Sequence, residues 1–528
     1  MIRVWLHGRD IGQGTETDEA DERELPGAHT RASIGRVVLA ELERVVPAAG
    51  RRPLTAATEL AACGIDDLLL ADAVARIEGR YGMRFRDEWL ARVTTCGDLV
   101  DCVAERMFDA ADRSQPPEPV PQPAVIRAPL QPPTNGSATD RLADAFPECA
   151  ALERRLADLA AAGLRNPFRL AAESVVGRTA RIDGREVVSF TSFDYLGLGS
   201  HPDVVQAAKE AIDRFGCGAS ASRMVGGNNT LLDELDAELA AFIGTERATV
   251  FPCGYGTNAS VFAHLFNAQD LILYDELAHN SIVRGAAASE AATRSFRHND
   301  HDQLDSLLRD IRGRYRRVVV AIEGVYSMDG DFPDLPRFIE IKQRHDALLY
   351  VDEAHSIGTM GRRGRGISEH FGVDPATGDL WMGTISKALG SGGGYLAGSR
   401  RLVDYLGLTT PAFVFSTACS PPNAAAALAA VRVLRREPWR VERLRERSTL
   451  FLKLADDAGL DTGDSGDTPV IPVILGSSQR ALAVSQALLE RGINARPILY
   501  PAVRESAARV RFFITSEHSE EQIVAAVE

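Results

Sequence analysis

A lysine in a setting that suits covalent chemistry stands at position 387, within GTISKALGSGGGYLAG (383–398). This segment follows an apolar, strand-like run, DLWMG, and surrounds Lys387 with hydroxyl groups and glycines. A lysine amine attacks an aldehyde cofactor when desolvation lowers its pKa, and glycines let a flat ring approach the backbone closely. A solvated turn lysine is the ordinary alternative, so other segments must decide between the two.

Two polar residues follow a second apolar run, ALLYVDEAHSIG (347–358), which ends in Asp352 with His355 three residues later. The run predicts a buried strand, and ligands of open α/β sheets bind at the carboxyl ends of such strands. A carboxylate there suits pyridoxal 5′-phosphate, because an aspartate paired with the ring nitrogen keeps it protonated and makes the ring an electron sink. A loop cap is the alternative for Asp352 alone.

Two further strand patterns end in groups that suit the same site. The run RVVVAIEGVYSMDGD (317–331) ends in Glu323 and Ser327, and RATVFPCGYGTN (247–258) leads through glycines into the helical pattern NASVFAHLF. A strand, a glycine turn and a helix start form an anion site from backbone N–H groups. This order predicts a place for the cofactor phosphate.

Eight segments together resemble the α-oxoamine synthases, a family of fold-type I pyridoxal-phosphate enzymes, over roughly residues 150–528. They occur in the family's order and at about its spacing: FDYLGLGSHPDV (193–204), GASASRMVGG (218–227), DELAHNSIVRG (275–285), EGVYSMDGD, VDEAHSIG, TISKALG, FSTACSPP (415–422) and ARVRFFITSEHSEEQI (508–523). The resemblance implies an α/β fold, with a mostly parallel sheet in a large domain and a smaller α/β domain at the C-terminus.

The resemblance also implies roles for residues around the cofactor ring. Lys387 would bond covalently to the cofactor and later move the Cα proton of the substrate. His279 would stack on the ring, and Asp352 would pair with the ring nitrogen. His355 would hydrogen-bond the phenolic oxygen, with Ser327 close by.

The phosphate and the substrate carboxylate have implied partners too. The phosphate cradle is expected from the backbone amides of Gly254 and Tyr255 and the hydroxyls of Thr384 and Ser386. Thr417 is similar to the family residue that reaches the phosphate from the other subunit, which implies a homodimer with a shared site.

Arg511 matches the arginine that holds the amino-acid carboxylate, a bidentate task that suits a planar guanidinium. Arg509 is the weaker candidate for the same role, since the alternation Arg509-Val510-Arg511 places both on one strand face.

Composition limits the other classes of function. The chain has 528 residues, of which 45% are hydrophobic, and a net charge of −14. The charge argues against nucleic acid as a partner. The seven cysteines are scattered with no metal-ligand spacing, so no metal site is expected. No run resembles a membrane span or a leader, which favours a cytoplasmic location.

Shifts in composition predict several regions along the chain. A stretch so rich in proline, SQPPEPVPQPAVIRAPLQPPTN, predicts an extended tether between domains. The expected regions are a disordered tail (1–33), a helical module (34–110), a Pro-rich linker (111–140), an N-terminal segment of the synthase (141–192), the cofactor-binding large domain (193–420) and a small domain (421–528).

The helical module at 34–110 resembles an acyl carrier protein, with Gly64-Ile65-Asp66-Asp67-Leu68 at the start of the second helix. Asp67 stands where the family has the serine that carries the phosphopantetheine arm. No serine occurs between residues 35 and 113, so a shifted alignment cannot restore one. Asp66 and Asp67 would instead cap the helix. We expect a degenerate carrier domain kept for docking, with an evolutionary remnant as the alternative.

The expected reaction is a decarboxylative condensation of a small amino acid with an acyl thioester, which gives an α-aminoketone. The acyl donor would be acyl-coenzyme A or a separate acyl carrier protein. An aminotransferase or a glycine C-acetyltransferase on the same fold is one alternative, and a non-catalytic docking protein is another. The fused carrier-like module favours secondary-metabolite or lipid assembly.

Overall fold

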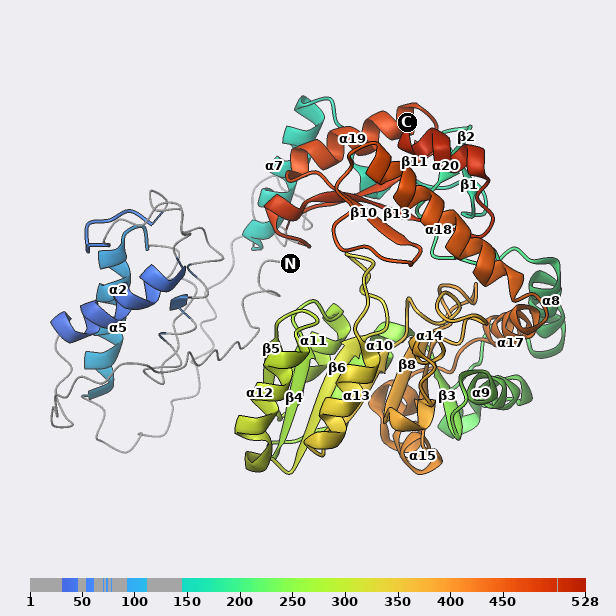
Figure 1. Cartoon of the computed structure of the whole chain (residues 1–528), viewed down its shortest axis with the longest axis horizontal. Coiled ribbons are helices and arrows are strands. Elements are labelled where there is room, and N and C mark those ends of the chain that lie inside the picture. The colour runs from blue at the N-terminus through green and yellow to red at the C-terminus, as the bar shows by residue number, and fades with distance from the viewer. Residues whose placement is uncertain are drawn as a thin grey trace, which may run out of the picture. The chain divides into compact units, whose positions relative to one another are not determined.

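The computed structural model describes residues 31–45, 54–60, 70, 73–74, 77, 93–111, 145–500 and 502–528. The chain divides into two compact units, Met1–Asp140 and Arg141–Glu528, which we describe separately (Figure 1). Most of the expected tail and linker, and the Asp66-Asp67 position, lie outside the described residues.

The N-terminal unit contains two described helices that share a core. Helix α2 (Arg31–Val45) packs against α5 (Cys96–Ala111) through apolar side chains that include Ile34, Val38 and Leu99. Helix α2 begins three residues before the expected start of the module at residue 34, because the first turn of a helix needs no apolar residue to begin. The Asp98 carboxylate accepts hydrogen bonds from the backbone amides of residues 94 and 95, and these bonds lower the pKa of Asp98 to about 2.

The C-terminal unit is built around a seven-stranded sheet in the order β3-β9-β8-β7-β6-β4-β5. Its strands are β3 (Arg247–Phe251), β4 (Asp270–Asp275), β5 (Ala292–Phe296), β6 (Arg317–Glu323), β7 (Leu348–Asp352), β8 (Leu380–Thr384) and β9 (Gly394–Gly398). Strand β9 runs antiparallel to β3 and β8, and the other neighbours are parallel. The expected mostly parallel sheet is confirmed.

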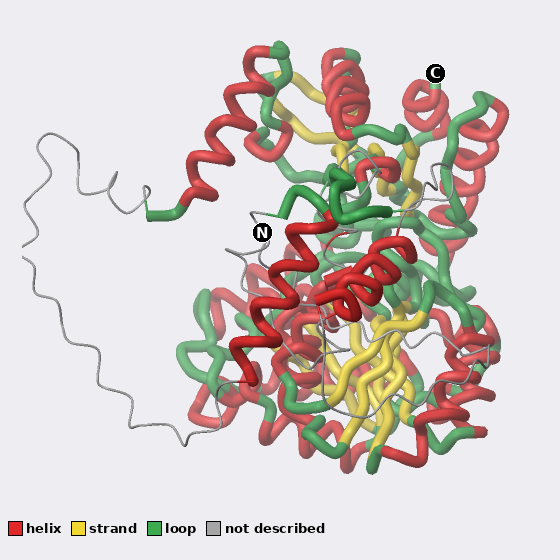
Figure 2. Tube along the Cα trace, turned by 90° about the vertical axis from the view of Figure 1, so that its left-hand side faces the viewer, coloured by secondary structure: helices red, strands yellow, loops and turns green. Residues whose placement is uncertain are grey.

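Helices cover both faces of this sheet, as Figure 2 shows. The helices of this region are α8 (Pro202–Phe215), α9 (Thr230–Ile243), α10 (Gly254–Leu265), α11 (Asn280–Ala288), α12 (His301–Ile311), α13 (Leu335–Arg344), α14 (Ile367–Phe371), α15 (Arg400–Thr409), α16 (Pro411–Val414) and α17 (Pro421–Arg436), of which α9, α10, α11, α13 and α15 contact strands of the sheet directly. Burial on both faces explains why β6 reads as a continuous apolar run, RVVVAIE, without alternation.

The small domain combines both ends of the C-terminal unit. Its elements are β1 (Thr179–Ile182), β2 (Arg185–Ser189), α18 (Trp439–Asp457), β10 (Val470–Ile474), α19 (Ser478–Glu490), β11 (Ile493–Asn494), β12 (Arg496–Ile498), β13 (Arg509–Phe513) and α20 (Glu520–Val527). Strand β2 pairs with β11, so residues from the segment 141–192 complete this domain. Helix α17, expected in the small domain, packs against α8 and α9 instead.

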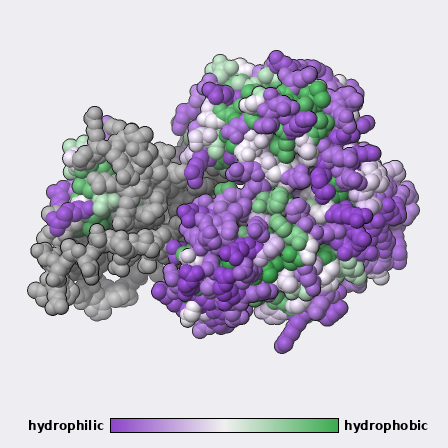
Figure 3. Space-filling view, viewed as in Figure 1, coloured by the Kyte–Doolittle hydropathy of each residue, from purple (hydrophilic) through white to green (hydrophobic). Residues whose placement is uncertain are grey.

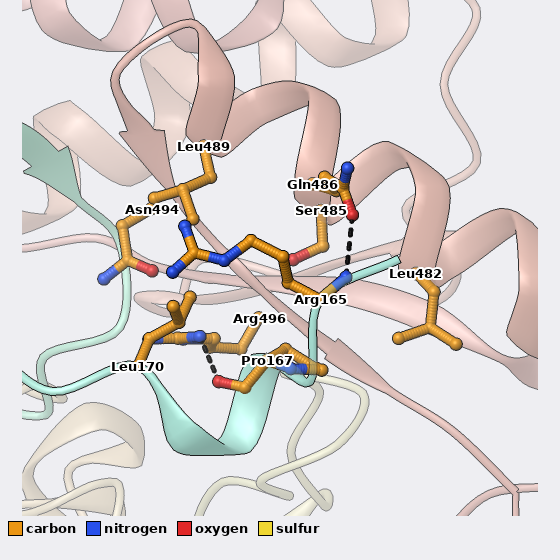
Figure 4. Close-up of a pocket in the computed structure, with 9 residues that line it drawn as sticks. All are labelled: Arg165, Pro167, Leu170, Leu482, Ser485, Gln486, Leu489, Asn494 and Arg496. Carbon is orange, nitrogen blue, oxygen red and sulfur yellow. Dashed lines mark hydrogen bonds between the residues drawn. The ribbon is translucent and has the colours of Figure 1, made fainter. Parts of the chain in front are cut away.

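A small pocket lies where the N-terminal segment meets the small domain (Figure 4). The amide of Arg165 donates to Gln486 Oε1 at 3.0 Å, and Arg496 donates to the carbonyl of Pro167. None of the residues expected in the active site lines this pocket. Its contacts attach the segment that follows the helix α7 (Pro147–Ala161) to the small domain.

Hydrophilic side chains cover much of the face of the C-terminal unit seen in Figure 3, with apolar patches between them. Among the helices that the structure describes, none has the length and hydropathy needed to cross a bilayer. The described residues also contain no cluster of His, Cys, Asp or Glu side chains suited to a metal ion.

Candidate active site

The carboxyl ends of neighbouring strands bring the expected residues to one edge of the large sheet. Asp352 ends β7 opposite Met382 of β8, and Glu323 ends β6 opposite Asp352. Thr384 ends β8, and Lys387 follows in the next turn. Parallel strands therefore place the lysine and the aspartate side by side, as the sequence predicted.

The environment of Lys387 makes its amine a usable nucleophile. Desolvation lowers the pKa of Lys387 to about 8, although Asp352 and Glu323 act in the opposite direction. An amine of this pKa has a neutral fraction near neutral pH that an exposed lysine lacks. The turn is held by the amide of Gly390, which donates to the Lys387 carbonyl at 2.8 Å. Gly390 has a φ of +59°, which a glycine adopts without strain.

Asp352 is buried and fixed by two hydrogen bonds. The Asn258 side chain donates to Asp352 Oδ2 at 2.7 Å, and the amide of Ala354 donates to Oδ1 at 2.9 Å. Asn258 also donates to Ser281 Oγ at 2.9 Å and accepts from the Tyr350 hydroxyl at 2.7 Å. The sequence analysis missed Asn258, which stands at the start of the helical pattern NASVFAHLF and differs there in no obvious way from the polar residues Ser260 and His264.

Glu323, beside Asp352, is only 2% exposed. Burial, with the neighbouring charge of Asp352, raises the pKa of Glu323 well above its usual value. Glu323 therefore holds its proton to a higher pH than an exposed glutamate does.

His355 is buried with its orientation set by Tyr195, a residue that sequence reasoning also missed. The Tyr195 hydroxyl and His355 Nδ1 are 2.8 Å apart. Burial lowers the pKa of His355 well below its usual range, so the imidazole is neutral. The direction of this hydrogen bond depends on the tautomer of the ring. In the tautomer that accepts the Tyr195 proton at Nδ1, the ring proton lies on Nε2 and can be donated to a ligand oxygen.

His279 caps α11 and presents an exposed ring at the same edge. Its Nδ1 lies 2.7 Å from the hydroxyl of Ser281, which is itself bonded to Asn258. The ring of Tyr255 approaches edge-on, with its centroid 6.1 Å away. His279 is thus held through one ring nitrogen at the edge of the sheet where the cofactor ring is expected.

The expected phosphate cradle is assembled around the start of α10. The amides of Gly254 and Tyr255 lie in the first turn, where a helix has no acceptor of its own to offer. A β-carbon added to Gly254 would lie 3.3 Å from Thr384 Oγ1, so the glycine allows this close approach. The hydroxyls of Thr384 and Ser386 both donate to the carbonyl of Gly393. Both hydroxyls must rotate away from that carbonyl before they can donate hydrogen bonds to a phosphate.

The two arginines of β13 differ in their remaining capacity to bind a ligand. Arg509 is 4% exposed and is engaged by Asp329, at 2.5 Å, and by the Met328 carbonyl at 2.9 Å. Arg511 donates from Nη1 to the Ser327 carbonyl, while its buried Nε has no partner. Arg511 therefore retains N–H donors that can bind a carboxylate, whereas the guanidinium of Arg509 is already bound to Asp329. Ser327 lies at this edge through its contact with Arg511.

Thr417 is not brought to this edge by contacts within the described chain. It is exposed in the segment after α16, next to Phe415, which is 84% exposed. The amide of Ala418 donates to the carbonyl of Ala221 at 3.0 Å and fixes the segment. The expected reach of Thr417 to a phosphate in another subunit stays a prediction.

The arrangement fits pyridoxal phosphate at each part of that molecule. Lys387 offers an amine of lowered pKa for the aldehyde, and Asp352 offers a fixed carboxylate for the ring nitrogen. The Gly254 turn would cradle a phosphate, which a β-carbon there would crowd. The Arg511 Nε atom, which has no hydrogen-bond partner in the protein, can donate to a further anion.

Comparison with known proteins gives consistent matches. A model of the family described as aminotransferase class I and II matches residues 185–528. An 8-amino-7-oxononanoate synthase of Symbiobacterium thermophilum is 39% identical over 372 residues, which cover 70% of this chain and 94% of that protein. The 8-amino-7-oxononanoate synthase 1 of Bacillus velezensis is also 39% identical, over 67% of this chain and 90% of that protein.

Solved structures agree with these relatives. A serine palmitoyltransferase of Sphingomonas wittichii is 32% identical and has a TM-score of 0.69, covering 73% of this chain and 96% of that one. A structure described as SPT with PLP is 30% identical, with the same TM-score and coverage. The edge of the sheet that holds Lys387 and Asp352, together with these matches, shows that the chain belongs to the aminotransferase class I and II family of pyridoxal-phosphate enzymes, as an acyl-transferring relative of the 8-amino-7-oxononanoate synthases.

Proposed function

We propose that this protein joins a small α-amino acid to the acyl group of a thioester, with loss of the amino-acid carboxylate as CO₂. The new bond forms between the amino-acid Cα and the acyl carbonyl carbon. The thiol leaves, and the product is an α-aminoketone. The observation that carries the proposal is the Lys387 amine, with a pKa of about 8, beside the fixed carboxylate of Asp352.

Pyridoxal phosphate, when bound, supplies an electron sink that makes the Cα proton removable. Arg511 binds the amino-acid carboxylate through donors that no protein group uses, and so orients the Cα toward Lys387. Lys387 takes the Cα proton, because its amine is partly neutral. Asp352 would pair with the ring nitrogen and favour its protonated form, and His355, positioned by Tyr195, would donate to the phenolic oxygen.

We further propose that the enzyme works as a homodimer with Thr417 reaching the partner's site. Three exposed apolar side chains lie around Thr417 and support an interface there: Met224 at 48%, Val225 at 84% and Phe415 at 84%. A hydrogen bond from Ala418 to Ala221 and the stacking of Arg223 on Phe413 join the two segments that carry them. An apolar patch of this kind marks an interaction site.

The N-terminal unit is proposed to dock a separate acyl carrier protein rather than to carry an acyl group itself. Support comes from the packed pair α2 and α5, which indicates a folded module, and from the lack of any serine between residues 35 and 113. The acyl donor would then be an acyl carrier protein in the complete reaction, with acyl-coenzyme A as the free substitute.

A covalent test addresses the core of this proposal. Borohydride treatment of the purified holoenzyme should abolish its yellow absorption band and leave the cofactor mass on the peptide that contains Lys387. Lys387→Ala should keep noncovalent cofactor and make no product, whereas Lys209→Ala, at an exposed site on α8, should behave as the unaltered enzyme. A cofactor adduct on another lysine would contradict the assignment.

The dimer has its own test. Lys387→Ala and Thr417→Val, each impaired alone, should restore part of the activity when subunits are mixed, because one of the two shared sites then contains both intact residues. Absence of recovery after verified subunit exchange would refute the shared site.

A further inference from the structure

Two phenylalanine rings connect the cations that the amino acid must contact. Lys387 Nζ lies 5.8 Å from the centroid of the Phe193 ring. The Phe193 ring meets Phe513 edge-on at a centroid distance of 4.7 Å. The guanidinium carbon of Arg511 lies 4.5 Å from the centroid of Phe513. A continuous chain of contacts therefore runs from Lys387 through both rings to Arg511.

The position of the substrate relative to these rings follows from its size, and this step rests on the proposed function. The carboxylate carbon and the Cα of an amino acid are joined by one bond. Arg511 must bind the first while Lys387 reaches the proton on the second. The substrate therefore lies in the space that Phe193 and Phe513 border, and its side chain starts from an atom next to that aromatic wall.

Phe193 is available for contact with a ligand. Phe193 is 38% exposed, although Ser192 before it and Tyr195 two positions after it are 6% and 0% exposed. Phe513 is 4% exposed and serves as the support behind it. A phenylalanine exposed beside a catalytic cation presents an apolar surface at the place where the substrate must sit.

Several polar groups near this wall are engaged within the protein, while the unpartnered Arg511 Nε is assigned to the substrate carboxylate in the proposed function. His355 Nδ1 lies 2.8 Å from the Tyr195 hydroxyl, and both oxygens of Asp352 accept hydrogen bonds. The Ser327 carbonyl accepts from Arg511. A hydroxyl group set against Phe193 would lose its hydrogen bonds to water and gain none from the aromatic rings.

We propose that Phe193 is a specificity-determining residue that presents an apolar wall to the amino-acid side chain, so that the site takes glycine or alanine in preference to serine. An apolar site rejects an added hydroxyl by up to about 100-fold. The expected preference for alanine over serine is thus on the order of 10- to 100-fold in kcat/KM.

Three forms of the enzyme test this role: the unaltered protein, Phe193→Asn and Phe193→Leu. For each, glycine, alanine and serine are titrated against the absorption of the bound cofactor, and kcat/KM is measured with one acyl-coenzyme A. The unaltered enzyme should favour alanine over serine. Phe193→Asn should reduce that ratio about tenfold by improving serine, since the amide can pair with the hydroxyl. Phe193→Leu, the apolar control, should keep the preference.

Two results would overturn the inference. One is an unaltered enzyme that binds serine as tightly as alanine. The other is an equal change for all three amino acids in Phe193→Asn and Phe193→Leu, which would mean that Phe193 only supports Arg511 through Phe513. Failure of the proposed function looks different, because no amino acid would then shift the absorption of the unaltered enzyme and borohydride would leave no adduct on Lys387.

Discussion

Replacement of Asn258 by leucine tests whether a buried amide orients the cofactor-binding carboxylate. Asn258 is 1% exposed and makes three hydrogen bonds, to Asp352, Ser281 and Tyr350. Leucine has a similar volume and no polar atoms, so the change removes the hydrogen bonds while it leaves little cavity. Its effects should reach both stability and cofactor affinity.

The expected loss of stability has two parts. The hydrogen bond to the charged Asp352 is worth about 1.5–3 kcal/mol, and the Tyr350 hydroxyl left without an acceptor costs about 1–3 kcal/mol. Allowing for overlap, Asn258→Leu should lower the free energy of unfolding by about 3–5 kcal/mol. Tyr350→Phe removes only the bond farther from Asp352 and should cost about 1 kcal/mol. The double variant should regain part of the loss, because no hydroxyl then remains unpaired.

Urea unfolding of the cofactor-free proteins measures these differences, and fluorescence titration with pyridoxal phosphate measures affinity. A less well oriented Asp352 should weaken cofactor binding in Asn258→Leu by about tenfold, which corresponds to about 1.4 kcal/mol. Tyr350→Phe should bind nearly as the unaltered protein. The reasoning is refuted if Asn258→Leu keeps its unfolding midpoint, or if Tyr350→Phe weakens cofactor binding as much as Asn258→Leu.

Three other predictions concern separate parts of the chain. Burial lowers the pKa of His298, but its hydrogen bonds to Asp275 and Asp331, at 2.9 and 2.7 Å, outweigh burial and raise it to about 10. The protonated His298 stabilises the folded state fully below about pH 6.5, and this contribution is lost as the pH rises through 10. The free energy of urea unfolding should therefore decline over that pH range in the unaltered protein and not in His298→Gln. Parallel pH curves of the free energy of unfolding for the two proteins would contradict this prediction. Arg511→Lys should raise the KM for the amino acid far more than the cofactor Kd, and an equal effect on both would count against the carboxylate role. Deletion of residues 1–135 should leave condensation with acyl-coenzyme A unchanged and weaken condensation with the acyl group on its cognate acyl carrier protein. Equal rates of the full and the shortened protein with that carrier would favour the alternative that the N-terminal unit is an evolutionary remnant.

The sequence could predict the sheet and the place of the chemistry because both depend on local patterns. Continuous apolar runs marked β6 and β7 as strands buried on both faces, and the residues just after them had to share one edge. Lys387, Asp352 and His355 could therefore be expected together before any contact was known. The sequence did not predict the packing of α17, which was expected in the small domain and packs against α8 and α9. A helical pattern does not reveal which element the helix packs against.

The supporting residues could not be predicted, because their partners lie far away in the sequence. Asn258 bonds to Asp352 across 94 positions, and Tyr195 bonds to His355 across 160. The first contact arises because β3 reaches the central strands through β9, which brings the start of α10 to the end of β7. Phe193 contacts Lys387 only because the 193–199 turn packs on the lysine turn, where a β-carbon on Gly390 would lie 2.3 Å from the amide of Gly199. The residues that react are thus marked by local sequence, while those that orient them and select the substrate are set by topology.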